Sequence, residues 1–151
     1  MDPATVQTQV QRIEAADIAR GVLRLLDELG SAGITEFSLA NGRRADVIAL
    51  DDKGQVTIVE IKSSWVDYAT DGKWPEYREF CDAFYFAVAE SFPHERIPQE
   101  AGLIIADRFG GAVLRPSPLI ALPAARRRAL TLRLARVAMV RWRAAGETVI
   151  G

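Results

Sequence analysis

The chain has 151 residues, of which 49% are hydrophobic and 26% charged, as expected for one soluble globular domain. No apolar run approaches the ~20 residues of a membrane-spanning helix, and the N-terminus lacks the pattern of a signal peptide. We therefore expect a cytoplasmic protein with no membrane partner. One cysteine and one histidine exclude an internal disulfide and argue against a zinc site.

Charge is distributed unevenly, although the net charge is only −1. Residues 1–123 carry 12 basic and 19 acidic side chains, a balance of −7, whereas residues 124–151 carry seven arginines and one glutamate, a balance of +6. A local basic surface of this kind attracts polyanions. The near-neutral total therefore leaves DNA open as a partner.

The first part of the chain predicts one long helix followed by strands. Apolar residues at close to 3.6-residue spacing indicate an amphipathic helix over residues 5–29, which Gly30 would end. A short strand is expected over residues 35–40. Two runs rich in strand-forming residues, 43–50 and 55–63, then flank a glycine-containing turn at 52–54, which is typical of a hairpin.

The second part of the chain alternates short elements with turns and ends in a helix. In order, we expect polar turns over 64–72, a short helix over 74–80, a strand over 84–89, a loop over 90–100, a buried strand over 102–106, a turn at Gly110-Gly111, a strand over 112–115 and a basic helix over 124–145. No repeat or linker interrupts this order. Residues 1–151 are therefore predicted to form a single α/β domain, in which helices flank a mixed sheet.

The predicted hairpin carries three charges on strands that are otherwise apolar. Its register would set Asp46 opposite Glu60, and alternation puts both on one face together with Lys62. That face also carries two expected pairs, Ile48 with Ile58 and Leu50 with Val56. The opposite face is apolar as well, with Val47, Ala49, Val59 and Ile61. The three charges are therefore expected at the open end of a strand pair that is covered on both sides.

This arrangement has two interpretations. Two carboxylates with Cβ atoms about 5 Å apart repel each other unless a cation joins them, and Mg²⁺ or Mn²⁺ prefers such oxygen ligands. Lys62 could then orient a nucleophile or stabilise charge on a phosphoryl group. The alternative is structural: Glu60 and Lys62 form a salt bridge, and Asp46 merely ends a strand. The pattern itself does not choose between them.

The spacing also resembles a known motif. Asp46, followed after thirteen residues by Glu60-Ile61-Lys62, resembles the motif of the PD-(D/E)XK nuclease superfamily, and the order helix, three strands, helix, strand resembles its core. Over residues 20–143 the chain is similar to the MmcB-like DNA repair protein family, a branch of that superfamily. The segments that carry this similarity are GRRADVIALDDKGQVTIVEIKSS, DGKWPEYREFCDAFYFAV, GLIIAD and ARRRALTLRLARVA.

The resemblance implies a restriction-endonuclease-like fold and a Mg²⁺- or Mn²⁺-dependent DNA nuclease that acts in repair. Asp46, Glu60 and the carbonyl of Ile61 would bind the metal, and Lys62 would be the catalytic lysine. The chain departs from the pattern in having Ala45 where proline usually precedes the aspartate. A degenerate member of the superfamily can bind DNA without cutting it, so a non-catalytic DNA-binding module is the second hypothesis. An interaction domain with a structural ionic cluster is the third.

Further residues could extend the site. Many superfamily members add a glutamate from the first helix, here Glu14 or Glu28, and Glu36 is another candidate. Each of the remaining candidates has a structural alternative, as a strand end, a helix cap or a core residue: Arg44 and Lys73 for phosphate, Asp71 for the acidic cluster, and Trp74 or Tyr77 for base stacking.

The basic C-terminal helix offers contacts to a DNA backbone through Arg126, Arg127, Arg128, Arg133 and Arg136. A solvated basic face, or pairing with the acidic residues 1–123, accounts for these arginines equally well. The sequence also leaves a homodimer open.

Overall fold

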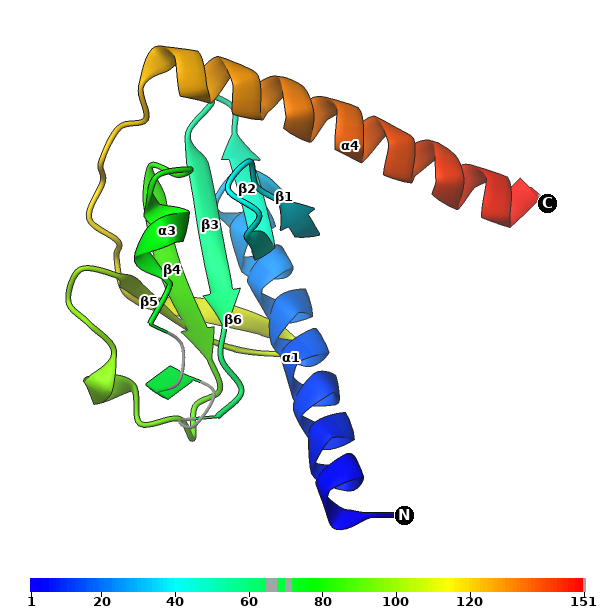
Figure 1. Cartoon of the computed structure of the whole chain (residues 1–151), viewed down its shortest axis with the longest axis vertical. Helices are drawn as coiled ribbons and strands as arrows, with labels where there is room; N and C mark the ends of the chain where they lie inside the picture. The colour runs from blue at the N-terminus through cyan, green and yellow to red at the C-terminus, as the bar shows by residue number, and fades with distance from the viewer. Residues whose placement is uncertain (65–67, 70–71, 151) are drawn as a thin grey trace.

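The computed structural model describes residues 1–64, 68–69 and 72–150, with side chains as far as residue 147. In chain order it contains α1 (Pro3–Glu28), β1 (Ser31–Ser38), β2 (Arg44–Asp51), β3 (Val56–Ile61), α3 (Pro75–Arg78), β4 (Ala83–Val88), the 3₁₀ turn η1 (His94–Arg96), β5 (Gly102–Asp107), β6 (Gly110–Arg115) and α4 (Ala124–Ile150) (Figure 1). Within the described residues, no helix is both long and apolar enough to cross a membrane.

The strands form one mixed sheet in the order β1-β2-β3-β4-β5-β6. β3, β4 and β5 run parallel to one another, whereas the β1–β2, β2–β3 and β5–β6 pairs are antiparallel. The hairpin has the predicted register, with Leu50 opposite Val56 and Ile48 opposite Ile58. The fold is therefore α/β, a mixed sheet flanked by helices, as predicted, and is consistent with a restriction-endonuclease-like core.

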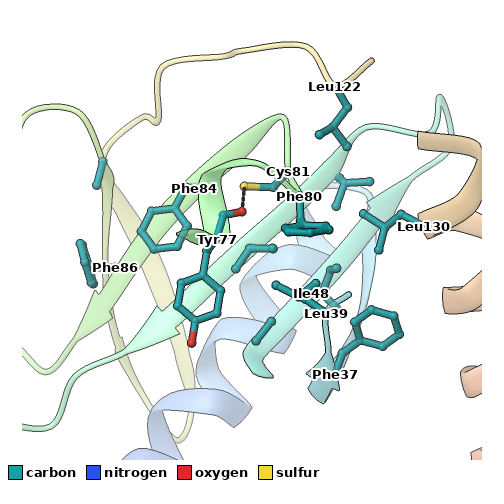
Figure 2. Packing of buried hydrophobic residues seen from close by; sticks show 14 of the residues in the cluster. Phe37, Leu39, Ile48, Tyr77, Phe80, Cys81, Phe84, Phe86, Leu122 and Leu130 are labelled. Atoms are coloured by element: carbon teal, nitrogen blue, oxygen red, sulfur yellow. Dashed lines mark hydrogen bonds between the residues drawn. The ribbon is translucent and has the colours of Figure 1, made fainter. Parts of the chain in front are cut away.

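Each face of the sheet has its own apolar core, because helices cover both faces. On one face, α1 packs Ile18, Val22, Leu25 and Leu26 against residues of β2, β3, β4 and β5. On the other face, Tyr77 of α3 packs in one core with Phe84 and Phe86 of β4, and Leu130 of α4 belongs to the same core (Figure 2). Leu134 of α4 extends this core. The N-terminal half of α1 and the C-terminal half of α4 extend beyond the sheet (Figure 1).

Two of the differences from the predicted element boundaries concern β1 and β6. β1 begins at Ser31 rather than residue 35, because the small residues after Gly30 pair with β2; a Cβ on Gly33 would lie 2.9 Å from Leu23 Cδ2, so a larger residue there would require the Leu23 side chain to move. The turn expected at Gly110-Gly111 is wrong, since both glycines belong to β6. The chain turns two residues earlier, at residues 108–109, where the Asp107 side chain accepts hydrogen bonds from the N–H groups of Phe109 and Gly110 at 2.8 and 3.2 Å.

A buried ion pair joins α4 to the rest of the domain. Arg127 donates to both carboxylate oxygens of Asp82, at 2.5 and 2.7 Å, and the N–H groups of Val56 and Leu122 donate to the same carboxylate. Burial alone would raise the pKa of Asp82, but the hydrogen bonds from Arg127 and the two backbone groups outweigh it and lower that pKa to about 2. One carboxylate thus fixes the start of β3, the segment before α4 and α4 itself.

Replacing Arg127 tests this connection. Arg127→Ala leaves Asp82 charged, buried and without its guanidinium, so we expect the free energy of unfolding to fall by about 3 kcal/mol and the melting temperature by roughly 6–12 °C. Arg128→Ala is the control, because Arg128 is exposed one residue further on, and it should change stability by less than ~0.5 kcal/mol.

The same comparison has a pH dependence. The folded-state pKa of Asp82 lies below its ordinary value of 3.8, so its contribution is present above pH 3.8 and is lost as the pH falls towards 2. The difference in free energy of unfolding between wild type and Arg127→Ala, measured with urea, should become smaller over that interval. If the difference stays constant between pH 3.8 and 2, the ion pair does not cause the stability loss of Arg127→Ala.

Candidate functional site: a carboxylate pair beside a pocket

The side-chain alternation of β1 and β2 shifts by one residue beside the predicted site. Ala45 and Val47 should share a face, yet Ala45 packs in the core beneath α3 and α4 while Val47 packs in the core beneath α1. On β1, Glu36 has a φ of 52°, in the left-handed region that non-glycine residues rarely adopt. The pairing of the two strands passes from Thr35–Val47 directly to Phe37–Ala45. The irregularity therefore lies at Glu36 and Asp46.

This shift corrects one prediction. Asp46 was expected on the face of Ile48, but it lines a pocket on the α1 side of the sheet together with Glu36 and Ile61. The shift coincides with the left-handed backbone at Glu36, at the point where the two-residue period of both paired strands is interrupted. As a result, a carboxylate that would have been buried under α3 and α4 faces a cavity instead.

The pocket has a volume of about 480 Å³ and lies between α1 and the sheet. Its α1 wall consists of Leu23, three alanines and two arginines, and its sheet wall consists of Thr35, Glu36, Asp46 and Ile61; the residues of α1 between the two arginines are Ala15, Ala16 and Ala19. Short side chains on the helix leave space opposite the carboxylate. This volume suits a small ligand or a single nucleotide-sized group.

Two reciprocal hydrogen bonds tie Asp46 to β3. The N–H of Asp46 donates to Glu60 Oε1 at 3.0 Å, and the N–H of Ile61 donates to Asp46 Oδ2 at 2.8 Å. These bonds begin where the regular β2–β3 pairing ends, at Val47–Val59. Each carboxylate thus takes the place of a backbone carbonyl, and both are held on rigid strands.

The pKa of Glu60 is strongly shifted by its surroundings. Its residue is only 4% exposed, and burial followed by the charge of Asp46 raises its pKa to about 9, whereas the charge of Lys62 acts in the opposite direction. Lys62 is itself 7% exposed, and its backbone N–H continues the sheet by donating to the Ala87 carbonyl at 3.1 Å. The structure therefore brings Asp46, Glu60 and Lys62 together, with Asp46 on the accessible side.

The donor set can be compared with the needs of a divalent ion. Carboxylate and carbonyl oxygens are the ligands that Mg²⁺ prefers, and Mg²⁺ usually keeps several waters and takes only one or two carboxylates. Among the described residues no group of three or more acidic, histidine or cysteine side chains converges. A site of Asp46, Glu60 and the Ile61 carbonyl, completed by water, fits these preferences. A cation there would also offset the charge repulsion and burial that raise the pKa of Glu60.

Most residues of the predicted secondary site lie elsewhere. Glu36 lines the pocket, but Glu14 and Glu28 are exposed on α1 and do not line it. Arg44 is exposed at the start of β2, outside the pocket lining, and its carbonyl accepts a hydrogen bond from the Tyr77 hydroxyl at 3.2 Å. Lys73 is exposed just before α3. Asp71 lies outside the described residues.

The two candidate stacking residues belong to the aromatic core. Trp74 stacks on Phe84 with ring centroids 5.5 Å apart. Tyr77, which is buried, stacks on the same ring at 6.1 Å, and Figure 2 shows Tyr77 beside Phe84. Their partners are therefore protein side chains, which is the structural alternative for both.

Three of the five α4 arginines predicted to contact DNA have partners within the chain. Arg127 pairs with Asp82, Arg126 donates to the Glu79 carbonyl at 3.0 Å, and Arg133 donates to the Ser38 carbonyl at 2.6 Å. Arg126 and Arg133 also lie over the rings of Phe80 and Phe37. Arg128 and Arg136 are exposed. DNA contact by this helix stays a prediction, and three of the five arginines proposed for it already bind groups within the chain.

The sequence reasoning missed Arg12 and Arg20, the two cations that line the pocket. A signal was available, because they are eight residues apart and therefore share one helix face. That face also carries the alanines, which weaken the apolar stripe at this point. The sequence did not reveal that this face of α1 lies opposite Asp46, because the position of Asp46 depends on the shift in side-chain alternation.

These features define a class of protein: an α/β fold in which a mixed sheet lies between helices, with two carboxylates and a lysine close together where the β2–β3 pairing ends. The chain belongs to the MmcB-like DNA repair protein family, whose description is "DNA repair protein MmcB-like" and whose model matches residues 2–148. It is also similar to the solved SPO1766 protein of unknown function from Silicibacter pomeroyi, with 39% identity, a TM-score of 0.85, and 87% of this chain and 90% of that chain covered. None of the curated proteins matches.

Stability as a function of pH tests the state of Glu60. Its folded-state pKa lies far above the ordinary 4.5, so ionisation costs the folded protein stability as the pH rises from about 5 towards 9. Glu60→Gln removes this cost, and in EDTA at pH 8.5 it should be more stable than wild type by at least about 2 kcal/mol. At pH 5 the difference should be small. Urea unfolding at both values measures it.

The matched control is Glu100→Gln, at an exposed loop position, which should follow wild type at both pH values. If Glu60→Gln and wild type lose stability in parallel between pH 5 and 8.5, Glu60 is ionised in the fold and its assignment as a high-pKa group is wrong.

Proposed function

We propose that this chain is a divalent-metal-dependent DNA nuclease that acts in repair. The observation that carries the proposal is the meeting of Asp46 and Glu60, from neighbouring strands, beside a pocket of about 480 Å³. Membership of a DNA repair family supplies the substrate class. The hydrogen bonds between the carboxylates and the backbone of the opposite strand supply the rigidity that a catalytic site needs.

In this proposal Asp46, Glu60 and the Ile61 carbonyl hold the ion. When bound, Mg²⁺ or Mn²⁺ would polarise the phosphoryl group and lower the pKa of a bound water. Asp46 is the part of the site that the substrate meets first, because it is half-buried and lines the pocket. Glu60 lies behind it and fixes its backbone through the 3.0 Å hydrogen bond.

Lys62 has the electrostatic role. Its ammonium is close enough to Glu60 to lower the pKa of that carboxyl, so it adds positive charge to the same site. A lysine there can donate to the attacking water or to a phosphoryl oxygen and stabilise the charge that develops during hydrolysis. Its burial excludes water from the ammonium, which strengthens both interactions.

A second function, DNA binding without cleavage, is favoured by one specific observation. Glu60 and Lys62 are 4% and 7% exposed, so Asp46 is the one residue of the three that is not fully buried. If no cation reaches Glu60, it stays protonated at neutral pH, and the three residues then form a structural cluster inside a DNA-binding domain.

Cleavage assays separate the two functions. Purified protein is incubated with single-stranded, nicked and branched DNA in Mg²⁺, Mn²⁺ or EDTA, beside Asp46→Asn, Glu60→Gln and Lys62→Met. We expect metal-dependent cutting by wild type and a loss of about 100-fold or more in each variant. Glu60→Gln is the sharpest variant, because it is expected to be more stable than wild type, so lost activity cannot be attributed to unfolding.

Exposed residues of the same types serve as controls. Glu100→Gln and Lys53→Met should cut as wild type does, since both side chains are exposed and outside the pocket lining. Salt-sensitive DNA binding that survives all three site variants, with no cutting under any metal condition, would establish the second function in place of the first.

A further inference from the structure

One face of α1 carries polar groups that continue beyond the pocket. Thr5, Thr8, Gln9 and Arg12 line a second hollow, of about 270 Å³, on the N-terminal half of the helix. Arg12 borders both this hollow and the carboxylate pocket, so the two are adjacent. From Thr5 to Arg20 the face is about 22 Å long at ~1.5 Å per residue. It therefore forms a continuous path that passes the pocket lined by Asp46.

The cations on this path are spaced on either side of the pocket. Arg12 and Arg20 lie about 12 Å apart along the helix axis, and only alanines from α1 line the space between them. Both arginines are exposed. Arg20 has one ion pair, with Asp17 at 3.6 Å, and surface pairs of this kind are weak enough for a phosphate to replace.

The surroundings make α1 a better phosphate-binding element than α4. The α4 arginines 126, 127, 133 and 141 donate to carbonyls or to a carboxylate of the chain. Among the described residues, the cations that line the carboxylate pocket come from α1. The N-terminal half of α1 also projects past the sheet, so a long ligand can lie along it without meeting other elements (Figure 1).

The size of the pocket restricts the ligand. A cavity of about 480 Å³ admits one nucleotide, whereas a double helix is too wide to enter it. Phosphate groups suit the arginines, and hydroxyl and amide groups such as those of Thr5 and Gln9 commonly contact the sugar–phosphate backbone.

We propose that the Thr5–Arg20 face of α1 binds a single DNA strand, with Arg12 and Arg20 contacting phosphates on either side of one nucleotide that occupies the pocket. This inference rests on the proposed function, since it uses the same pocket, and it names the substrate class as unpaired DNA: single strands, or duplexes with single-stranded overhangs. Arg12 and Arg20 are then positioning residues for the strand.

Fluorescence anisotropy tests this proposal without relying on cleavage. Three labelled DNAs are used: a single strand of about 12 nucleotides, the blunt duplex, and a duplex with an overhang. Ca²⁺ or EDTA replaces Mg²⁺. We expect wild type to bind the single strand and the overhang at least about tenfold more tightly than the blunt duplex. The double variant Arg12→Ala/Arg20→Ala should weaken single-strand binding at least about tenfold and reduce the salt slope by about 1.4, the value for two lost phosphate contacts.

The matched control removes the same charge elsewhere. Arg24→Ala/Arg143→Ala alters two exposed arginines, one on α1 outside the pocket lining and one near the end of α4. It should bind within about twofold of wild type. Arg12→Lys/Arg20→Lys should restore most of the affinity and the salt slope, which shows that a loss in the alanine variant is electrostatic rather than a folding defect.

Several results would overturn the proposal: wild-type affinity in the Arg12/Arg20 double alanine variant, an equal loss in the control, or equal binding of blunt duplex and single strand. The proposed hydrolysis fails independently. If wild type binds single strands through Arg12 and Arg20 but never cuts DNA, the strand path stands and the nuclease assignment falls.

Discussion

The site depends on two hydrogen bonds in which side chains replace the backbone partners of a sheet. Beyond Val47–Val59, the N–H of Asp46 bonds to the Glu60 carboxylate and the N–H of Ile61 bonds to the Asp46 carboxylate. Neither backbone donor is left unsatisfied, although regular pairing has ended. The same exchange holds the two carboxylates together and sets Asp46 beside the pocket, so the architecture and the chemistry have a common origin.

In the part of the chain that the structure describes, the carboxyl groups of the two buried acidic residues, Asp82 and Glu60, have pKa values shifted in opposite directions. Asp82 is surrounded by donors, including the Arg127 guanidinium, and its pKa falls to about 2. Glu60 faces a second carboxylate, and the charge of Lys62 does not offset this and the burial, so its pKa rises to about 9. One acid is thus fully compensated and joins structural elements. The other is left short of positive charge, buried behind Asp46, which lines the pocket.

The sequence predicted much of this because its signals are local. The period of α1, the register of the β2–β3 hairpin and the adjacency of Asp46 and Glu60 follow from spacing alone. The side on which Asp46 lies does not, because it depends on one left-handed residue, Glu36, and glutamate carries no sign of that conformation. The pocket positions of Arg12 and Arg20 were equally hidden, since they depend on contacts distant in the sequence. Pairing of Arg127 with an acidic residue of 1–123 was one of the open alternatives, but the sequence did not single out Asp82.

The basic helix α4 contributes to the site through the backbone of β1, the edge strand of the sheet. Arg141 donates to the carbonyls of Thr35 and Glu36, at 2.5 and 2.8 Å, and Arg133 donates to that of Ser38 at 2.6 Å. These bonds satisfy carbonyls around the left-handed residue, and they also cover an edge that could otherwise pair with another chain. Part of the positive charge of residues 124–151 therefore stabilises the irregular backbone at Glu36. Because Glu36 and Asp46 both line the pocket, a helix that does not itself line the pocket supports the backbone of its wall.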